Sequence, residues 1–192
     1  MKHRFEPTDN SALEVKINIR KMILSEIEHP TILDCFAGEG IMWQACYQGL
    51  EYFSIDKRGL SSSLKMDSSK FLRSSKLERY NFFDLDAWGS PWYHFWIIMN
   101  KRKFKEDEKI GIVLTDGLDF TMKMSNTQIG IKKLLNIPKE MRIPGLDRHA
   151  NFIRSYLVKR GCEISGVEIL KSNTAQNSRG NVSYFGLLLV KN

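Results

Sequence analysis

Apolar and polar residues follow a pattern along the chain that changes between helical spacing and short strand-like runs. Residues 12–28 have apolar positions at helical spacing until Pro30, which predicts an N-terminal helix with Ser11 at its cap. Short apolar runs predict strands over residues 31–36, 52–56, 64–67, 80–85 and 110–115. Helical stretches between them are expected over residues 41–48, over 68–77 and, opened by Pro91 with Ser90 as its cap, up to the polar run 101–109.

The C-terminal part follows the same pattern after an interruption. Alternation lapses over residues 118–148, which we interpret as an insertion. A helix capped by Asp147 is expected to end at Gly161. Two last apolar runs, 163–170 and 182–190, flank a polar stretch and predict a long-looped hairpin, which would make one strand antiparallel.

This order of elements predicts an α/β fold. Strands that alternate with helices favour a mostly parallel sheet, here of seven strands, with helices on both faces and an antiparallel last strand. In such a sheet, ligands bind at the carboxyl ends of the strands. The length of 192 residues suits a single domain over 1–192.

Composition narrows the class of protein. A hydrophobic content of 42% excludes a disordered chain, and no apolar run approaches the roughly 18 residues that cross a bilayer. The N-terminus does not resemble a secretory signal, so we expect a cytoplasmic protein without a membrane partner. The three cysteines and four histidines show no metal-binding spacing, so no metal is expected. The net charge of +7 favours polyanionic partners such as nucleic acids.

The first strand ends in a glycine-rich turn, Ala37-Gly38-Glu39-Gly40. Glycines at this place let a ligand approach the backbone. A dinucleotide fingerprint would need a third glycine where Trp43 stands, and the acids Asp34 and Glu39 disfavour a pyrophosphate. An acidic turn suits a cofactor with positive ammonium and sulfonium groups, which S-adenosylmethionine has.

Two further acids follow the next strands. Asp56 ends the second strand, where a carboxylate can accept hydrogen bonds from both ribose hydroxyls of an adenosine. Asp67, with Ser68 beside it, is placed to bind the adenine amino group. Each acid alone is more readily explained as a helix cap or a solvated loop residue, but three of them around one glycine turn favour a cofactor site.

These motifs resemble those of the class I S-adenosylmethionine-dependent methyltransferases. The resemblance covers most of the chain and implies their Rossmann-like fold. It also implies a set of cofactor-binding residues: Asp34, Phe36, Ala37, Gly38, Gly40, Asp56, Lys57, Asp67, Ser68 and Asp84.

The octapeptide Asp84-Leu-Asp-Ala-Trp-Gly-Ser-Pro91 follows the fourth predicted strand. Seven of its positions agree with the signature of the tRNA N2,N2-dimethylguanosine methyltransferases, with Ala87 in place of a proline. That resemblance implies that Asp86 accepts the protons of an exocyclic amine and that Trp88 stacks on the base. The resemblance also implies that Pro91 contacts the substrate. A cytosine-C5 methyltransferase would need a cysteine nucleophile after a proline, which the chain lacks.

The 118–148 insertion carries more basic than acidic residues. In this fold it would lie at the carboxyl edge of the sheet, where phosphates of the acceptor can be neutralised. The residues expected to contact the substrate are Lys123, Lys132, Lys133 and Arg142.

The sequence therefore predicts an N-methyltransferase that acts on a nucleic acid base, with guanine N2 of RNA favoured. Adenine N6 or cytosine N4 of DNA is an alternative acceptor. A non-catalytic, methyltransferase-like subunit that binds nucleic acid is an alternative of another class. Small-molecule and protein acceptors stay open, as does the oligomeric state.

Overall fold

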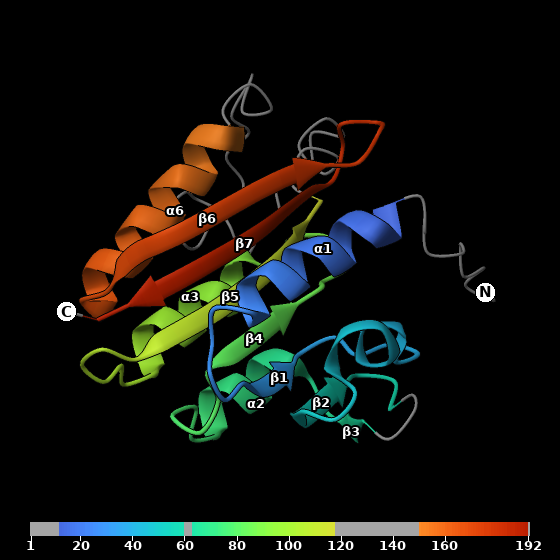
Figure 1. The fold of residues 1–192 in the computed structure, drawn as a ribbon, viewed down its shortest axis with the longest axis horizontal. Helices are drawn as coiled ribbons and strands as arrows, with labels where there is room; N and C mark the ends of the chain where they lie inside the picture. The colour runs from blue at the N-terminus through green and yellow to red at the C-terminus, as the bar shows by residue number, and fades with distance from the viewer. Residues whose placement is uncertain (1–11, 60–62, 118–149, 192) are drawn as a thin grey trace, which may run out of the picture.

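The computed structural model describes residues 12–59, 63–117 and 150–191. Its centre is a seven-stranded sheet in the order β3-β2-β1-β4-β5-β7-β6 (Figure 1). The strands are β1 (Thr31–Asp34), β2 (Glu51–Asp56), β3 (Leu64–Lys65), β4 (Phe82–Leu85), β5 (Lys109–Asp116), β6 (Glu168–Gln176) and β7 (Ser183–Val190). Strand β7 is antiparallel to β5 and β6, and the other neighbouring pairs are parallel. The predicted sheet with one antiparallel strand is confirmed.

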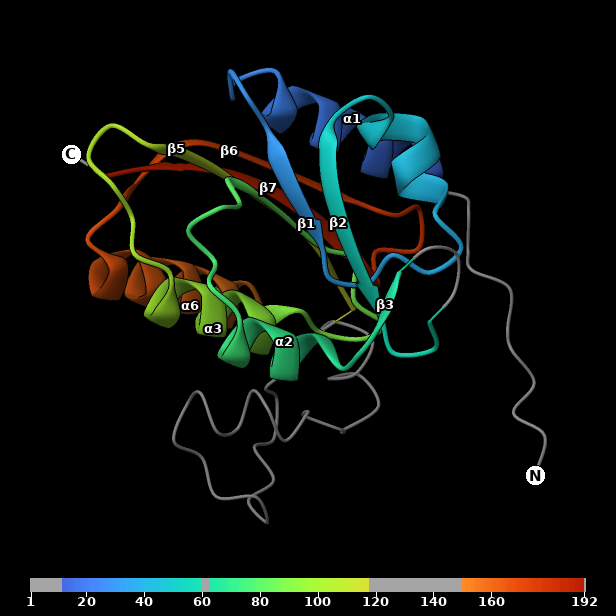
Figure 2. The same cartoon turned by 90° about the horizontal axis from the view of Figure 1, so that it is seen from below.

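Helices cover both faces of the sheet, as predicted (Figure 2). Helix α1 (Leu13–Leu24) and the π-helical segment η2 (Trp43–Tyr47) lie on one side. On the other face lie α2 (Ser68–Ser74), α3 (Trp92–Lys101) and α6 (Ala150–Ser165). The sheet is thus the middle of three layers.

Alternation along the central strands divides the apolar side chains between two cores. Ile32 of β1 and Phe82 of β4 pack with α1, whereas Leu33 and Phe83 pack on the opposite side. Because side chains two residues apart share a face, the carboxylates that follow on β1 and β4 point toward α1. This alternation places the acidic groups of the candidate site.

Helix α1 is shorter than the predicted 12–28, and the predicted cap at Ser11 lies outside the described residues. The predicted cap at Ser90 is wrong, because Pro91 is the N-cap residue of α3 and no side chain caps that helix. Pro91 is buried there.

The last hairpin differs most from the prediction. Strand β6 begins at Glu168 and continues through the polar residues 171–176, so the predicted long loop is reduced to residues 177–182. β6 lies at the edge of the sheet, where exposed and half-buried positions alternate. An edge strand tolerates polar side chains, so β6 lacks the long apolar run from which a strand is predicted.

Helix α6 continues past Gly161, its predicted end, to Ser165. A Cβ atom at position 161 would lie 2.8 Å from Cε1 of Phe95, so this glycine allows α6 to pack closely on α3. Gly166, with φ of +65°, follows the last helical residue and is suited to end it.

Several expectations lie outside the described residues. They are the 118–148 insertion, the Asp147 cap and the predicted substrate contacts Lys123, Lys132, Lys133 and Arg142. Within the described ranges, no helix has the length and apolarity needed to span a membrane. The same ranges hold no group of three or more histidine, cysteine, aspartate or glutamate residues placed around a metal ion.

We expect Gly161→Ala to destabilise the fold, although alanine is the better helix former by about 1 kcal/mol. The new methyl group would collide with Phe95, and overpacking costs about 1–3 kcal/mol. Urea unfolding of the variant measures the balance. Ser155→Ala, at an exposed position of α6, is the control and should be neutral or slightly stabilising. A Gly161→Ala variant more stable than the wild type would contradict the close packing.

Candidate functional site

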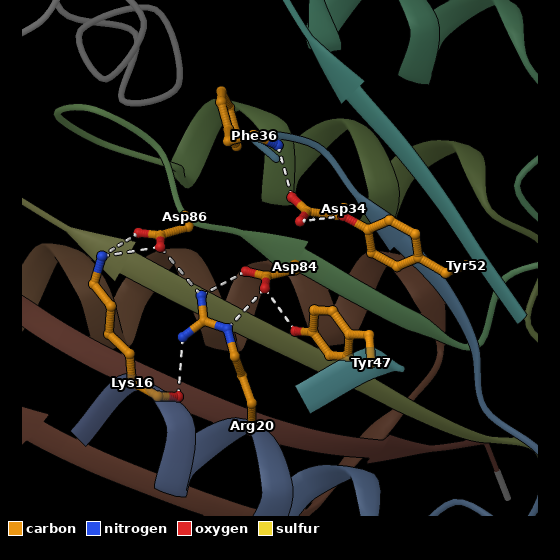
Figure 3. A network of polar contacts seen from close by, with 8 residues as sticks. All are labelled: Lys16, Arg20, Asp34, Phe36, Tyr47, Tyr52, Asp84 and Asp86. Carbon is orange, nitrogen blue, oxygen red and sulfur yellow. Dashed lines mark hydrogen bonds and ion pairs between the residues drawn. The ribbon is translucent and has the colours of Figure 1, made fainter. Parts of the chain in front are cut away.

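The carboxyl ends of β1 and β4 bring three carboxyl groups to the side of the sheet that α1 covers (Figure 3). Asp34 ends β1, Asp84 lies in β4, and Asp86 follows that strand. Asp34 and Asp84 are neighbours in the register of the sheet. The sequence predicts Asp34 and Asp84 as cofactor residues and Asp86 as the acceptor carboxylate, and the structure places all three at the ends of these two neighbouring strands.

Asp84 is fully buried and both of its oxygens are bound. The Arg20 guanidinium of α1 donates from Nε to Oδ2 at 2.7 Å and from Nη2 to Oδ1 at 2.8 Å. The Tyr47 hydroxyl of η2 donates to Oδ2 at 2.6 Å. Burial, then the Asp84 charge, raises the pKa of Tyr47, so this phenol stays protonated and donates. Asp84 therefore anchors α1 and η2 behind the site, and its contact with a cofactor stays a prediction.

Asp34 accepts hydrogen bonds from the backbone N–H of Phe36 at 3.0 Å and from the Tyr52 hydroxyl at 2.9 Å. Burial and the neighbouring Asp84 carboxylate raise its pKa to about 8. In this network, two cations, Lys16 and Arg20, face three carboxyl groups. Asp34 is the group without a cation and holds a proton instead.

Asp86 lies nearer the surface, with its side chain 17% exposed. The Lys16 ammonium contacts both carboxylate oxygens at 2.9 Å, and Arg20 Nη2 lies 3.4 Å from Oδ2. Burial alone would raise the pKa of Asp86, but Lys16 and Arg20 outweigh it and lower the pKa below its usual value. Asp86 is therefore an ionised acceptor at neutral pH.

The loop after β4 presents an aromatic ring to solvent. The Trp88 side chain is 88% exposed, while Ala87 before it is buried. The Gly117 N–H donates to the Gly89 carbonyl at 2.6 Å, which ties this loop to the end of β5. An exposed tryptophan on an anchored loop is available to stack on a planar ligand.

The glycine turn after β1 has the open backbone that the sequence predicts. Gly38 and Gly40 have φ values of +53° and +81°, in the region that favours glycine. The Gly38 N–H donates to Asp56 Oδ2 at 3.1 Å, and the Arg58 N–H donates to Oδ1 at 2.7 Å. Asp56 thus holds the turn and the residues that follow β2. Ala37 is buried and Lys57 is exposed.

Asp67 is the N-cap residue of α2 and accepts from the Lys70 N–H at 3.0 Å. The Ser69 hydroxyl also donates to it, and this bond lowers the pKa of Asp67. The hydroxyl of Ser68 donates to the Cys35 carbonyl and joins α2 to the end of β1. The structure therefore gives Asp67 the capping role that the sequence left open, and a contact with adenine stays a prediction.

Two polar atoms at or just before the first turn of α3 lack a hydrogen-bond partner among the described residues. They are Ser90 Oγ and His94 Nδ1, both buried. The His94 ring lies edge-on to Phe36 of the glycine turn, 4.9 Å between centroids. Burial lowers the pKa of His94 to about 4, so the imidazole is neutral. Buried polar atoms without partners are rare, so these two fit a site that a polar ligand completes.

The Asp34 carboxyl, which has no cationic partner in this network, fits a ligand that carries a positive charge. A positive group beside it would favour its ionised form. The residues present are therefore compatible with S-adenosylmethionine, whose ammonium and sulfonium are cationic.

Sequence reasoning missed the basic side of the network. Lys16 and Arg20 lie at the same helical spacing as Ile23 and Ile27, and this stripe was a signal that they face the sheet. The buried Asp116, at the end of β5, accepts from Trp92 Nε1 at 3.0 Å and pairs with Arg154 at 2.7 Å.

We expect Arg20→Met to destabilise the protein by about 3–5 kcal/mol, because Asp84 would be left buried without its cation. Chemical denaturation measures the loss. The double variant Arg20→Met with Asp84→Leu removes both charges and should be less destabilised than Arg20→Met alone. A single variant within about 1 kcal/mol of the wild type would show that the pair does not hold α1 on the sheet.

Asp34 should make stability depend on pH. Its pKa of about 8 in the folded chain lies above the ordinary aspartate value of 3.8, so the folded state holds a proton that the unfolded chain releases. The free energy of unfolding therefore falls as the pH rises from about 4 to 8, and Asp34→Asn should flatten this dependence. Urea midpoints across that range test it, with the exposed Glu163→Gln as control. An unchanged slope in Asp34→Asn would refute the assignment.

No protein-family model and no curated protein matches this chain. Solved structures do match it. Trm1 from Pyrococcus horikoshii, in complex with S-adenosyl-L-methionine, has a TM-score of 0.56 and 13% identity, over 98% of this chain and 56% of its own. TYW2 from M. jannaschii, in complex with AdoMet, has a TM-score of 0.55 and 9% identity, over 97% of this chain and 79% of its own. TYW2 from P. horikoshii, in complex with MeSAdo, has a TM-score of 0.51 and 16% identity, over 98% of this chain and 64% of its own.

The chain thus spans little more than half the length of Trm1. At these identities, the similarity establishes the fold. The fold that the motifs implied is confirmed: the chain has the Rossmann-like fold of the class I S-adenosylmethionine-dependent methyltransferases.

Proposed function

We propose that the chain is an S-adenosylmethionine-dependent N-methyltransferase that acts on an exocyclic amine of a nucleic acid base, guanine N2 of RNA. The observation that carries the proposal is the pairing of an ionised Asp86 with an exposed Trp88 on one loop beside the glycine turn. These are the two groups that an N-methyltransferase needs for a planar amine. The acceptor motif resembles that of the tRNA dimethylguanosine methyltransferases, and Trm1, which shares the fold, was solved in complex with S-adenosyl-L-methionine.

S-adenosylmethionine, when bound, supplies the methyl group. The glycine turn and Asp34 would hold its charged end, and Asp56 its ribose. His94, whose ring contacts Phe36 of the turn, has a buried Nδ1 without a hydrogen-bond partner among the described residues, and this atom would be available to the cofactor.

The acceptor base would be held by the loop after β4. Trp88 can stack on its face, since an aromatic ring contributes about 1–3 kcal/mol per stacked base. The Asp86 carboxylate accepts the amine N–H groups and directs the nitrogen lone pair toward the methyl group. A carboxylate that stays ionised is suited to this role. A protonated carboxyl would direct its own O–H donor at the N–H donors of the amine.

A nucleic acid is the favoured acceptor for reasons of charge. The chain carries 29 lysine and arginine residues against 22 aspartate and glutamate residues. A positive excess attracts phosphate backbones and steers their encounter with the protein. We infer that the predicted basic residues of the 118–148 segment contribute to this contact.

Transfer of a labelled methyl group tests the function. The protein is incubated with labelled S-adenosylmethionine and either bulk tRNA or bulk DNA, and the nucleosides are then separated. Label in N2-methylguanosine supports the proposal, and label in a DNA base moves the acceptor to adenine or cytosine. Cofactor binding without transfer to either would refute a nucleic acid acceptor.

We expect Asp86→Ala to lower turnover by roughly 10² to 10⁴, the range for a positioned proton acceptor, with cofactor affinity nearly unchanged. Single-turnover kinetics and calorimetric titration of the cofactor separate the two effects. Leu170→Ala, an exposed position on edge strand β6, is the control for surface substitution. An unchanged rate in Asp86→Ala would remove Asp86 from the mechanism.

A further inference from the structure

Two cationic side chains of helix α1 contact Asp86 in the loop after β4, and Lys16 is the nearer of them. Lys16 Nζ lies 2.9 Å from each oxygen of Asp86 (Figure 3). The two residues are 70 positions apart in the sequence, and the Lys16 side chain is only 13% exposed. The Lys16 stem is therefore enclosed by the fold, and its ammonium is directed at one carboxylate.

The geometry leaves part of that carboxylate open. An ionised carboxylate has about four lone-pair positions, and Lys16 and Arg20 approach it from the α1 side. The Asp86 side chain is still 17% exposed. The carboxylate is thus held by cations of α1 and keeps a small solvent-accessible surface, at which we expect the amine to approach.

We propose that Lys16 is a positioning residue of the acceptor site, which fixes the orientation of the Asp86 carboxylate and keeps it ionised for the exocyclic amine. This proposal rests on the proposed function. Lys16 acts through Asp86 and is not required to touch the base.

The reaction shows why the charge matters. The amine nitrogen forms a bond to the methyl carbon as the bond from that carbon to sulfur breaks, and the sulfonium becomes a thioether. The nitrogen, now positive, passes one proton to Asp86, which releases it to water. A carboxylate whose ionised form is stabilised by a cation releases that proton readily and is ready for the next amine.

The other groups around Asp86 cannot replace Lys16. Arg20, also on α1, lies farther away at 3.4 Å and is already bound by both oxygens of Asp84 on β4. Thr115 of β5 carries no charge, and its buried hydroxyl makes no hydrogen bond among the described residues. The Tyr184 ring of β7 lies 5.9 Å from Lys16 Nζ. Without Lys16, burial would raise the pKa of Asp86, and only the Arg20 guanidinium, which also binds Asp84, would oppose that rise.

The dependence of kcat/KM on pH tests the proposal in full-length protein. In Lys16→Met, we expect activity near pH 6 to be about tenfold or more below that near pH 8.5, because Asp86 becomes protonated in the lower range. Lys16→Arg keeps the charge and should follow the wild type. Lys21→Met removes an exposed lysine from the same helix and is the matched control. A loss in Lys16→Met that is equal at both pH values would overturn the proposal, since a structural defect alone predicts that result.

Carboxyl ¹³C NMR gives a readout that needs no methyl transfer. Asp86→Asn identifies the signal, and its titration midpoint is compared in the wild type and Lys16→Met. A higher midpoint in Lys16→Met supports the proposal, and equal midpoints overturn it. If the wild type methylates neither tRNA nor DNA, the proposed function fails, while the NMR comparison still decides whether Lys16 sets the ionisation of Asp86.

Discussion

The buried ion pair between Arg20 and Asp84 connects the helix layer to the sheet at the point where the site is built. A buried charge is tolerated only when it is paired and hydrogen-bonded, and both oxygens of Asp84 meet that condition through Arg20 and Tyr47. This ion pair fixes the position of α1 along the direction of β4. Once α1 is fixed, Lys16, one turn before Arg20, is at the level of Asp86. The position of the buried Asp84 carboxylate thus determines which cation meets the half-buried Asp86 carboxylate.

The same cluster has an uneven charge balance. Asp34 lies beside Asp84 on the neighbouring strand, and no cation in the network of Lys16 and Arg20 is left for it. It resolves the repulsion by holding a proton, as its raised pKa indicates. A site that is short of one positive charge favours a cationic ligand over a pyrophosphate. This charge balance agrees with the cofactor class that the acidic glycine turn indicates. It depends on Asp84, Lys16 and Arg20, which lie outside the sequence of the turn.

Much of the fold could be predicted because it depends on local patterns. The ends of β1, β2 and β4 are marked by acids after apolar runs, and parallel strands bring those ends together. The parts that failed depend on tertiary neighbours. Strand β6 can be polar because it lies at the edge of the sheet. Position 161 requires a glycine because the Phe95 ring lies against it. Neither reason is visible in the residues themselves.

The site was predicted from its acids, and its basic half was missed for a related reason. A lysine and an arginine on an amphipathic helix usually mark its solvated face, and only their alignment with Ile23 and Ile27 shows that they point inward.

This placement has a consequence for how the site works. If the cations of an acceptor site stood on a loop, their distance from the carboxylate would vary with the motion of that loop. On α1 they are held by the packing of a whole helix against β5 and β7. The ionisation of Asp86 is then coupled to the core packing of α1, so changes that loosen this helix should alter the acidity of the carboxylate before they unfold the protein.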